Sequence, residues 1–78
     1  MELTLYHFES CPYCRRVRDF MTSNNITIPM KDTQKDTRNR EELLKIGGKS
    51  QVPCLVINGK ALYESLDIID WLKNNYKK

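Results

Sequence analysis

The chain of 78 residues lacks a long apolar segment. A membrane-spanning helix needs about 20 consecutive apolar residues, and no stretch of this sequence approaches that length. The N-terminus also lacks the apolar core of a signal peptide, because Glu2 follows Met1 and the next apolar stretch is short. Linkers, internal repeats and low-complexity runs are missing as well. We therefore expect one domain covering residues 1–78, located in the cytoplasm.

A large excess of charge of one sign is missing too. The chain has 13 lysines and arginines against 10 aspartates and glutamates, which gives a formal net charge of +3 at pH 7. This excess is too small and too dispersed to predict a protein that binds nucleic acid. We expect the basic groups to lie on solvated surfaces. We also expect a monomer with neither a nucleic-acid nor a membrane partner.

Cysteines are few, and their number is odd. Cys11, Cys14 and Cys54 are the three, and an odd number does not make the disulfide framework of an extracellular domain. A structural zinc site usually needs four ligands. The chain has one histidine, His7, and neither a second Cys-x-x-Cys pair nor a His-x-x-x-His pair. We therefore expect no metal, and we interpret the cysteines as retained for their reactivity.

The alternation of apolar and polar residues predicts the element order β-α-β-α-β-β-α. Strands are expected at residues 3–8, 26–30, 52–57 and 60–63, and helices are expected to begin at Pro12, at Asp36 or Thr37, and at a Ser65 cap. Asn58–Gly59 is a hairpin signal, and Pro29 places the second strand at an edge. A parallel strand pair joined by a helix and followed by a hairpin gives an α/β fold, with one four-stranded mixed sheet flanked by three helices.

The sequence Cys11-Pro12-Tyr13-Cys14 carries the chemistry. Proline is favoured as the first residue of a helix, so Cys11 is expected at the junction of loop and helix. The backbone N–H groups and the dipole of the helix favour a thiolate there. Cys14 lies one turn further, on the apolar face of the helix. We therefore expect an exposed Cys11 that attacks disulfides and a less exposed, less acidic Cys14 that resolves the mixed disulfide.

Taken together, these features resemble the glutaredoxins over essentially the whole chain. The matching features are the strand before Cys-Pro-Tyr-Cys, Gln51-Val52-Pro53 before a later strand, Asn58–Gly59 and the final helix. The resemblance implies the thioredoxin fold, the sheet order 2-1-3-4 and a cis peptide before Pro53. It also implies an enzyme that uses glutathione to reduce protein disulfides and protein–glutathione mixed disulfides through Cys11 and Cys14.

The segment from Tyr63 to Asp67 departs from the commonest glutaredoxin pattern, which has paired glycines before the last helix. It looks like the N-terminal domain of glutathione transferases, where an acidic or amide residue precedes a serine. This similarity implies that Glu64 and Ser65 hold the γ-glutamyl end of glutathione. The backbone of Val52 is expected to pair with the extended tripeptide as an added strand would.

A second departure concerns the glycine end of glutathione. Many glutaredoxins have a lysine three residues before the first cysteine, and Phe8 occupies that position here. Lys49 and Gln51 are the nearest alternatives for the glycine carboxylate, and Arg40 is a weaker one. The residues expected to contact glutathione are Pro12, Tyr13, Lys49, Gln51, Val52, Pro53, Glu64 and Ser65.

Several alternatives stay open at the level of the sequence. Cys54 is either a packed core cysteine or a third redox-accessible thiol, and His7 is interpreted as a sheet residue in preference to a proton donor. Some glutaredoxin relatives are scaffolds that hold an iron–sulfur cluster with glutathione and the first cysteine, but Pro12-Tyr13 is unlike their usual smaller residues. A fragment of a glutathione transferase is the third alternative, although transferases need a second, helical domain.

Overall fold

Seven elements follow one another in the predicted order. A computed structural model describes residues 2–76 of the chain. Its elements are β1 (Leu3–His7), α1 (Pro12–Ser23), β2 (Met30–Asp32), α2 (Thr37–Gly47), β3 (Cys54–Ile57), β4 (Lys60–Tyr63) and α3 (Ser65–Asn75). Within residues 2–76, no helix is both long enough and apolar enough to cross a membrane.

The four strands form one mixed sheet in the order β2-β1-β3-β4. β1 pairs with β2 in parallel and with β3 antiparallel, and β3 pairs with β4 antiparallel. The expected sheet order and the edge position of β2 are therefore confirmed. The hairpin between β3 and β4 turns at Asn58 and Gly59, whose φ angles of 49° and 85° suit the two-residue turn that the sequence predicts.

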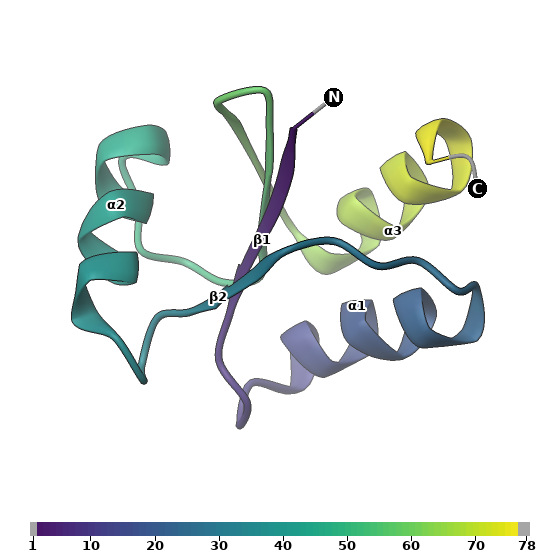
Figure 1. Ribbon diagram of the computed structural model, residues 1–78, viewed down its shortest axis with the longest axis horizontal. Coiled ribbons are helices and arrows are strands. Elements are labelled where there is room, and N and C mark those ends of the chain that lie inside the picture. Colours follow the sequence, from purple (N-terminus) through teal and green to yellow (C-terminus); the bar gives the residue numbers. More distant parts are fainter. Residues whose placement is uncertain (1, 77–78) are drawn as a thin grey trace.

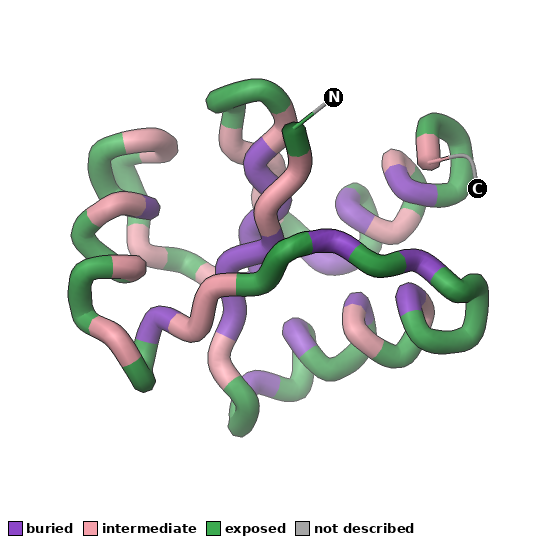
Figure 2. Tube along the Cα trace, viewed as in Figure 1, coloured by how far each residue is buried: buried purple, intermediate pink, exposed green. Residues whose placement is uncertain are grey.

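Helices cover both faces of the sheet. In Figure 1, α2 lies on one side, whereas α1 and α3 lie together on the other. Buried residues accordingly concentrate in β1 and on the inward sides of the helices (Figure 2). The core on the α1 and α3 side contains Leu5, Val17, Met21, Ile26, Ile28, Leu55, Ile68 and Leu72. The smaller core on the α2 side contains Tyr6, Leu43, Cys54 and Val56.

The second strand differs most from its predicted bounds. It begins at Met30 and not at residue 26, because Pro29 has no N–H to donate to a strand ladder. Pro29 still accepts a hydrogen bond of 2.9 Å from the Leu5 N–H through its carbonyl oxygen. Ile26 and Ile28 lie outside the strand, yet both are buried in the core. The alternating apolar pattern of Ile26 and Ile28 predicts their burial correctly, but it does not predict where strand pairing begins.

The ends of the other elements shift by one or two residues. β1 ends at His7, one residue early, and β3 begins at Cys54, after the cis Val52–Pro53 peptide. Asp36 caps α2 as expected, since its carboxylate accepts a hydrogen bond of 2.9 Å from the Arg38 N–H. Ser65 as the cap of α3 is wrong. It is the first helical residue, and Glu64 occupies the cap position.

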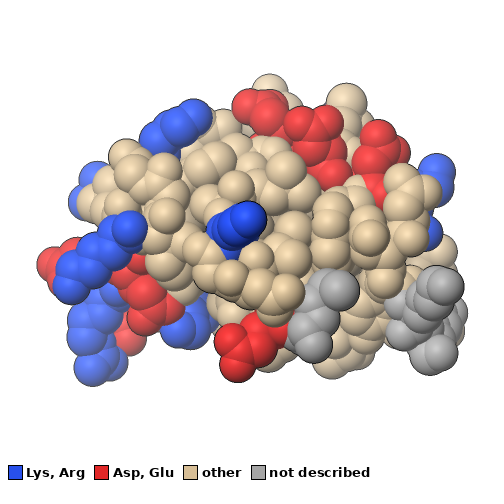
Figure 3. All heavy atoms as spheres, turned by 90° about the horizontal axis from the view of Figure 1, so that it is seen from above, with Lys and Arg blue, Asp and Glu red and all other residues tan. Residues whose placement is uncertain are grey.

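Charged side chains interleave at the α2 end of the molecule. Figure 3 shows basic and acidic groups intermingled there, at the left of the view. Two ion pairs account for part of this pattern, Lys31 with Glu42 and Arg38 with Asp36. The Glu42 carboxylate also accepts a hydrogen bond from the Tyr6 hydroxyl of β1, so the Lys31–Glu42 pair links β1, β2 and α2. One basic group of α2, Arg38, and one of β2, Lys31, are thus paired with neighbouring carboxylates.

Gly47 is the last residue of α2 and lies against β4. A Cβ atom at this position would stand 2.0 Å from the Tyr63 hydroxyl oxygen and 2.9 Å from the Ala61 Cβ. Overpacking of this kind typically costs about 1–3 kcal/mol. We expect Gly47→Ala to lower the free energy of unfolding by about that amount in urea denaturation. Adding Tyr63→Phe, which removes the nearest oxygen, should recover part of the loss. An alanine variant as stable as the parent would contradict this packing.

Candidate active site

The loop after β1 delivers Cys11 to the start of α1. The Cys11 N–H donates a hydrogen bond of 3.2 Å to the Phe8 carbonyl oxygen, which closes the turn between strand and helix. Cys11 is the N-cap residue of α1 and Pro12 is its first helical residue. The Cys11 Sγ accepts a hydrogen bond of 3.4 Å from the Cys14 N–H. The sulfur therefore takes the place that a serine or aspartate oxygen takes in an ordinary N-cap.

Cys11 is less accessible than its sequence position indicates. Only 6% of the residue is exposed, so the expectation of an exposed thiol is wrong. The side chain turns back onto the first turn of α1, where it meets the Cys14 N–H, and does not extend into solvent. The sulfur thus presents a small surface to a partner, and the N–H groups of the helix start lie beside it.

Cys14 is fully buried, with 0% of the residue exposed. This burial is the main cause that raises the pKa of its thiol to about 12, and the neighbouring Cys11 raises the pKa further. A backbone hydrogen bond from Phe8 and the charge of Arg18 act in the opposite direction. The expectation that the second thiol is less exposed than the first is confirmed.

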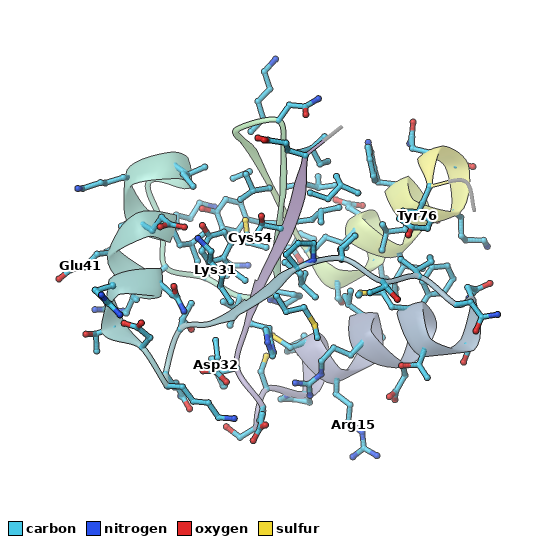
Figure 4. The ribbon with its side chains drawn as sticks, viewed as in Figure 1. Arg15, Lys31, Asp32, Glu41, Cys54 and Tyr76 are labelled. Atoms are coloured by element: carbon cyan, nitrogen blue, oxygen red, sulfur yellow. The ribbon has the colours of Figure 1, made fainter. Side chains whose placement is uncertain are left out.

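Cys54 lies on the opposite face of the sheet from α1. Side chains alternate along a strand, so Leu55 points into the core beneath α1 and α3 while Cys54 points into the core beneath α2. Figure 4 shows Cys54 between α2 and β1. The residue is 0% exposed, and burial raises the pKa of its thiol to about 11. Of the two alternatives for Cys54, the packed core cysteine is the one that the structure favours.

His7 ends β1 and is buried in the fold. Its Nδ1 lies 3.1 Å from an Nη1 nitrogen of Arg18, and its carbonyl oxygen accepts a hydrogen bond of 2.9 Å from the Thr33 N–H. Burial lowers the pKa of the imidazole, and the charge of Arg18 lowers it further. The histidine is therefore a sheet residue, as expected, and its ring is neutral at pH 7.

A groove of about 560 Å³ runs between the start of α1, the turn before β3 and the start of α3. Six of the residues expected to contact glutathione line it: Tyr13, Gln51, Val52, Pro53, Glu64 and Ser65. The peptide between Val52 and Pro53 is cis, which confirms the implication of the resemblance. Three segments that are distant in the sequence thus meet in one place, as the sequence analysis expects.

Two other predicted contacts do not line the groove. Pro12 is exposed at the start of α1 but is not among the described residues that form the groove wall. Lys49 is also outside the groove wall. Its Nζ lies 4.9 Å from the centre of the Tyr63 ring, and its carbonyl oxygen accepts a hydrogen bond of 3.0 Å from the Tyr63 hydroxyl. The basic side chain proposed for the glycine carboxylate is thereby directed to β4.

Three further residues line the groove without having been expected as glutathione contacts: Arg16, Leu66 and Asp67. Arg16 follows Tyr13 by three residues, so the two side chains share one face of α1, and its guanidinium lies 5.9 Å from the centre of the Tyr13 ring. That spacing is a signal in the sequence by which Arg16 could have been predicted to line the groove with Tyr13. Leu66 and Asp67 follow Ser65 in the first turn of α3, where short spacing also predicts proximity.

Opposite charges line the two helical walls of the groove. Arg16 lies on the α1 side, whereas Glu64 and Asp67 lie on the α3 side. The Gln51 amide donates a hydrogen bond of 3.4 Å to the Glu64 carboxylate, which orients that group. Glu64 has φ and ψ angles of 74° and 118° and, among the described residues, makes no side-chain hydrogen bond to cap α3. The first N–H groups of α3, in residues that line the groove, therefore have no side-chain cap.

A metal centre is not indicated at this site. Among residues 2–76, no group of three or more histidine, cysteine, aspartate or glutamate side chains could hold a metal ion. All three cysteines are free thiols. The arrangement places the sulfur of Cys11 at a helix start, the fully buried Cys14 one turn further along the helix, and a groove with opposite charges on its walls beside them.

Comparison with known proteins agrees with this geometry. The family model of the glutathione S-transferase N-terminal domain matches residues 5–78. Glutaredoxin 3 of Escherichia coli K12 is 29% identical over 56 residues, which cover 72% of this chain and 68% of that protein. A solved thioredoxin-like protein aligns with a TM-score of 0.78 at 27% identity, over 94% of this chain and 100% of that one.

Glutathione transferase E6 of Drosophila melanogaster aligns with a TM-score of 0.79 at 26% identity. The alignment covers 99% of this chain and 36% of the transferase, so the chain spans about a third of that protein. The family model, the relatives and the sheet order lead to one conclusion. The chain belongs to the family of the glutathione S-transferase N-terminal domain and is a glutaredoxin-like protein with the thioredoxin fold.

Proposed function

We propose that the chain is a glutathione-dependent thiol–disulfide oxidoreductase that acts on protein disulfides and protein–glutathione mixed disulfides. One observation carries the proposal. The sulfur of Cys11 lies at the N-terminus of α1 against the Cys14 N–H, and its neighbour Tyr13 lines the groove. A helix start stabilises a thiolate, which is the nucleophile in disulfide exchange. The similarity to Glutaredoxin 3 supports the same activity.

The reaction begins when the Cys11 thiolate attacks one sulfur of a disulfide. A new disulfide joins Cys11 to that half, and the other half leaves as a thiolate that takes up a proton from solvent. With a glutathione mixed disulfide, a second glutathione thiolate then releases oxidised glutathione and restores Cys11. With a protein disulfide, Cys14 attacks Cys11 instead and releases the reduced protein. Two glutathione molecules then reduce the Cys11–Cys14 disulfide.

Glutathione is the tripeptide that we place in the groove. It carries one ammonium group and two carboxylates, and the groove has acidic residues on one wall and a basic residue on the other. Glu64 and Asp67 would accept from the ammonium group. The N–H groups at the start of α3 and the Ser65 hydroxyl would bind the γ-glutamyl carboxylate. Arg16 would bind a carboxylate in place of the lysine that Phe8 replaces.

We further propose that residues 1–78 act as one glutaredoxin domain and as a monomer in the cytoplasm. Two cores, one on each face of the sheet, are closed by the chain's own helices, which supports folding as a unit. Glutathione conjugation is the second candidate function, because the matching family model is that of a transferase domain. An assay with a chlorinated aromatic electrophile separates the two, and we expect disulfide reduction without conjugation.

The reactivity of the three thiols follows from their burial. Burial raises the pKa of Cys14 to about 12 and that of Cys54 to about 11, so few of these groups are thiolates at pH 7. We expect iodoacetamide to modify Cys11 first in the folded protein, at least about tenfold faster than either other cysteine. Mass spectrometry of timed samples measures the order, and the denatured protein, with all three modified at similar rates, is the control. Labelling of Cys54 ahead of Cys11 would overturn the assignment.

The two thiols of the Cys-Pro-Tyr-Cys segment have separate roles in this mechanism. Cys11→Ser should abolish reduction both of protein disulfides and of glutathione mixed disulfides, because the attacking sulfur is lost. Cys14→Ser should retain turnover of glutathione mixed disulfides, since glutathione alone completes that route. Coupled glutathione reductase assays with each substrate measure both activities. Loss of all turnover in the Cys14 variant would show that the roles are wrongly assigned.

Arg16 is expected to matter for glutathione binding. Arg16→Met removes a charge that faces a carboxylate, so the KM for glutathione should rise about three- to tenfold, a modest effect because the groove is open to solvent. Arg15→Met is the matched control, because Arg15 pairs with Asp19 at 3.7 Å and extends away from the fold (Figure 4). Steady-state kinetics with varied glutathione measures the effect. Equal KM values for the two variants would exclude Arg16 from the binding site.

A further inference from the structure

Arg18 ties the loop that carries Cys11 to the middle of α1. One guanidinium nitrogen lies 3.1 Å from Nδ1 of His7, and the other donates a hydrogen bond of 3.2 Å to the Glu9 carbonyl oxygen. Arg18 follows Cys14 by four residues, so the two side chains lie on the same face of the helix, one turn apart. A half-buried positive charge is thus held beside the buried second thiol by two contacts that lie outside the helix.

The surroundings of His7 keep this contact in place. His7 is opposite Asp32 in the β1–β2 pairing, and Glu9 forms an ion pair of 3.0 Å with Lys35. These groups and Arg18 are the charges that act on the imidazole. Burial and Arg18 lower the pKa of His7, so the ring is neutral at pH 7. A neutral ring whose Nδ1 accepts from the guanidinium carries its proton on Nε2.

The three arginines of α1 are therefore directed to different places. Arg15 extends into solvent, and Arg16 lines the groove above Tyr13. Arg18 points back toward the end of β1 and lies one helical turn from Cys14, whose pKa its charge lowers against the larger effect of burial. This arrangement matters because Cys14 is fully buried and must lose its proton before it attacks.

We propose that Arg18 is a positioning residue for the resolving step, in which its guanidinium, held by His7 and Glu9, stabilises the Cys14 thiolate as it attacks Cys11. This inference rests on the proposed function. In the step, Cys14 first loses its proton to solvent. The Cys11–Cys14 bond then forms, the bond between Cys11 and its partner breaks, and the departing thiolate takes up a proton from solvent. The partner is reduced and the cysteine pair is oxidised.

The test measures closure of the Cys11–Cys14 disulfide directly. Reduced protein is mixed with oxidised glutathione at pH 7 and quenched with acid at set times. Mass spectrometry then resolves the reduced, Cys11-glutathionylated and internally oxidised forms. We expect the Cys11–Cys14 disulfide to close about three- to tenfold more slowly in Arg18→Met than in the parent, because losing the charge lowers the fraction of Cys14 present as thiolate. The effect is modest because the more basic Cys14 sulfur is also the better nucleophile. Arg18→Lys should recover most of the rate, and Arg15→Met should leave it unchanged.

The equilibrium between the glutathionylated and closed forms separates an electrostatic role from a structural one. Cys14 is protonated before closure at pH 7 in parent and variant alike, since burial raises its pKa to about 12. Arg18→Met should therefore leave this equilibrium within about twofold of the parent value. A variant that shifts the equilibrium as strongly as the rate would show that Arg18 only supports the fold. An unchanged closure rate in Arg18→Met would also overturn the proposal.

His7→Phe supplies a second measurement that does not depend on the folding of the Arg18 variants. It removes the Nδ1 acceptor and leaves the arginine free to move, so closure should slow in the same direction. Closure at the parent rate in a folded His7→Phe protein would contradict the role given to this contact. A parent protein that forms no glutathione adduct on Cys11 would refute the proposed function itself, and not only the role of Arg18.

Discussion

The site depends on the hydrogen bond between the Cys14 N–H and the Cys11 sulfur. A helix start leaves N–H groups without partners inside the helix, and here a sulfur accepts one of them. The same contact brings the sulfur back onto the helix and leaves the residue 6% exposed. The same hydrogen bond thus places the Cys11 sulfur where a helix start favours negative charge and limits the access of partners to it. The groove lined by Tyr13 lies beside this contact.

The central strand connects this contact with the rest of the fold. β1 pairs with β2 and β3, and its end at His7 fixes where the loop to Cys11 begins. Alternation along β1 and β3 sends Leu5 and Leu55 to one core and Tyr6 and Cys54 to the other. Each face of the sheet is covered by helices. Arg18 adds a polar link from α1 to this loop.

Much of this arrangement is predictable from the sequence, and the exceptions have physical reasons. The element order, the sheet topology and the hairpin follow from local patterns such as Asn58–Gly59 and Asp36. Six of the nine groove residues follow from the family resemblance. Strand pairing depends on a partner distant in the sequence, so Ile26 and Ile28 reveal burial but not the start of β2. The burial of Cys11 and the direction of Lys49 depend on side-chain conformations that no pattern specifies.

The sheet lies between the core that holds Cys54 and the helix that begins beside Cys11. Backbone hydrogen bonds between β1 and β3 run through this layer and separate its two faces. In the proposed exchange reaction, the sheet would keep this third cysteine apart from the Cys11–Cys14 pair. Chemical modification of the Cys54 thiol would therefore identify molecules in which α2 has moved away from the sheet.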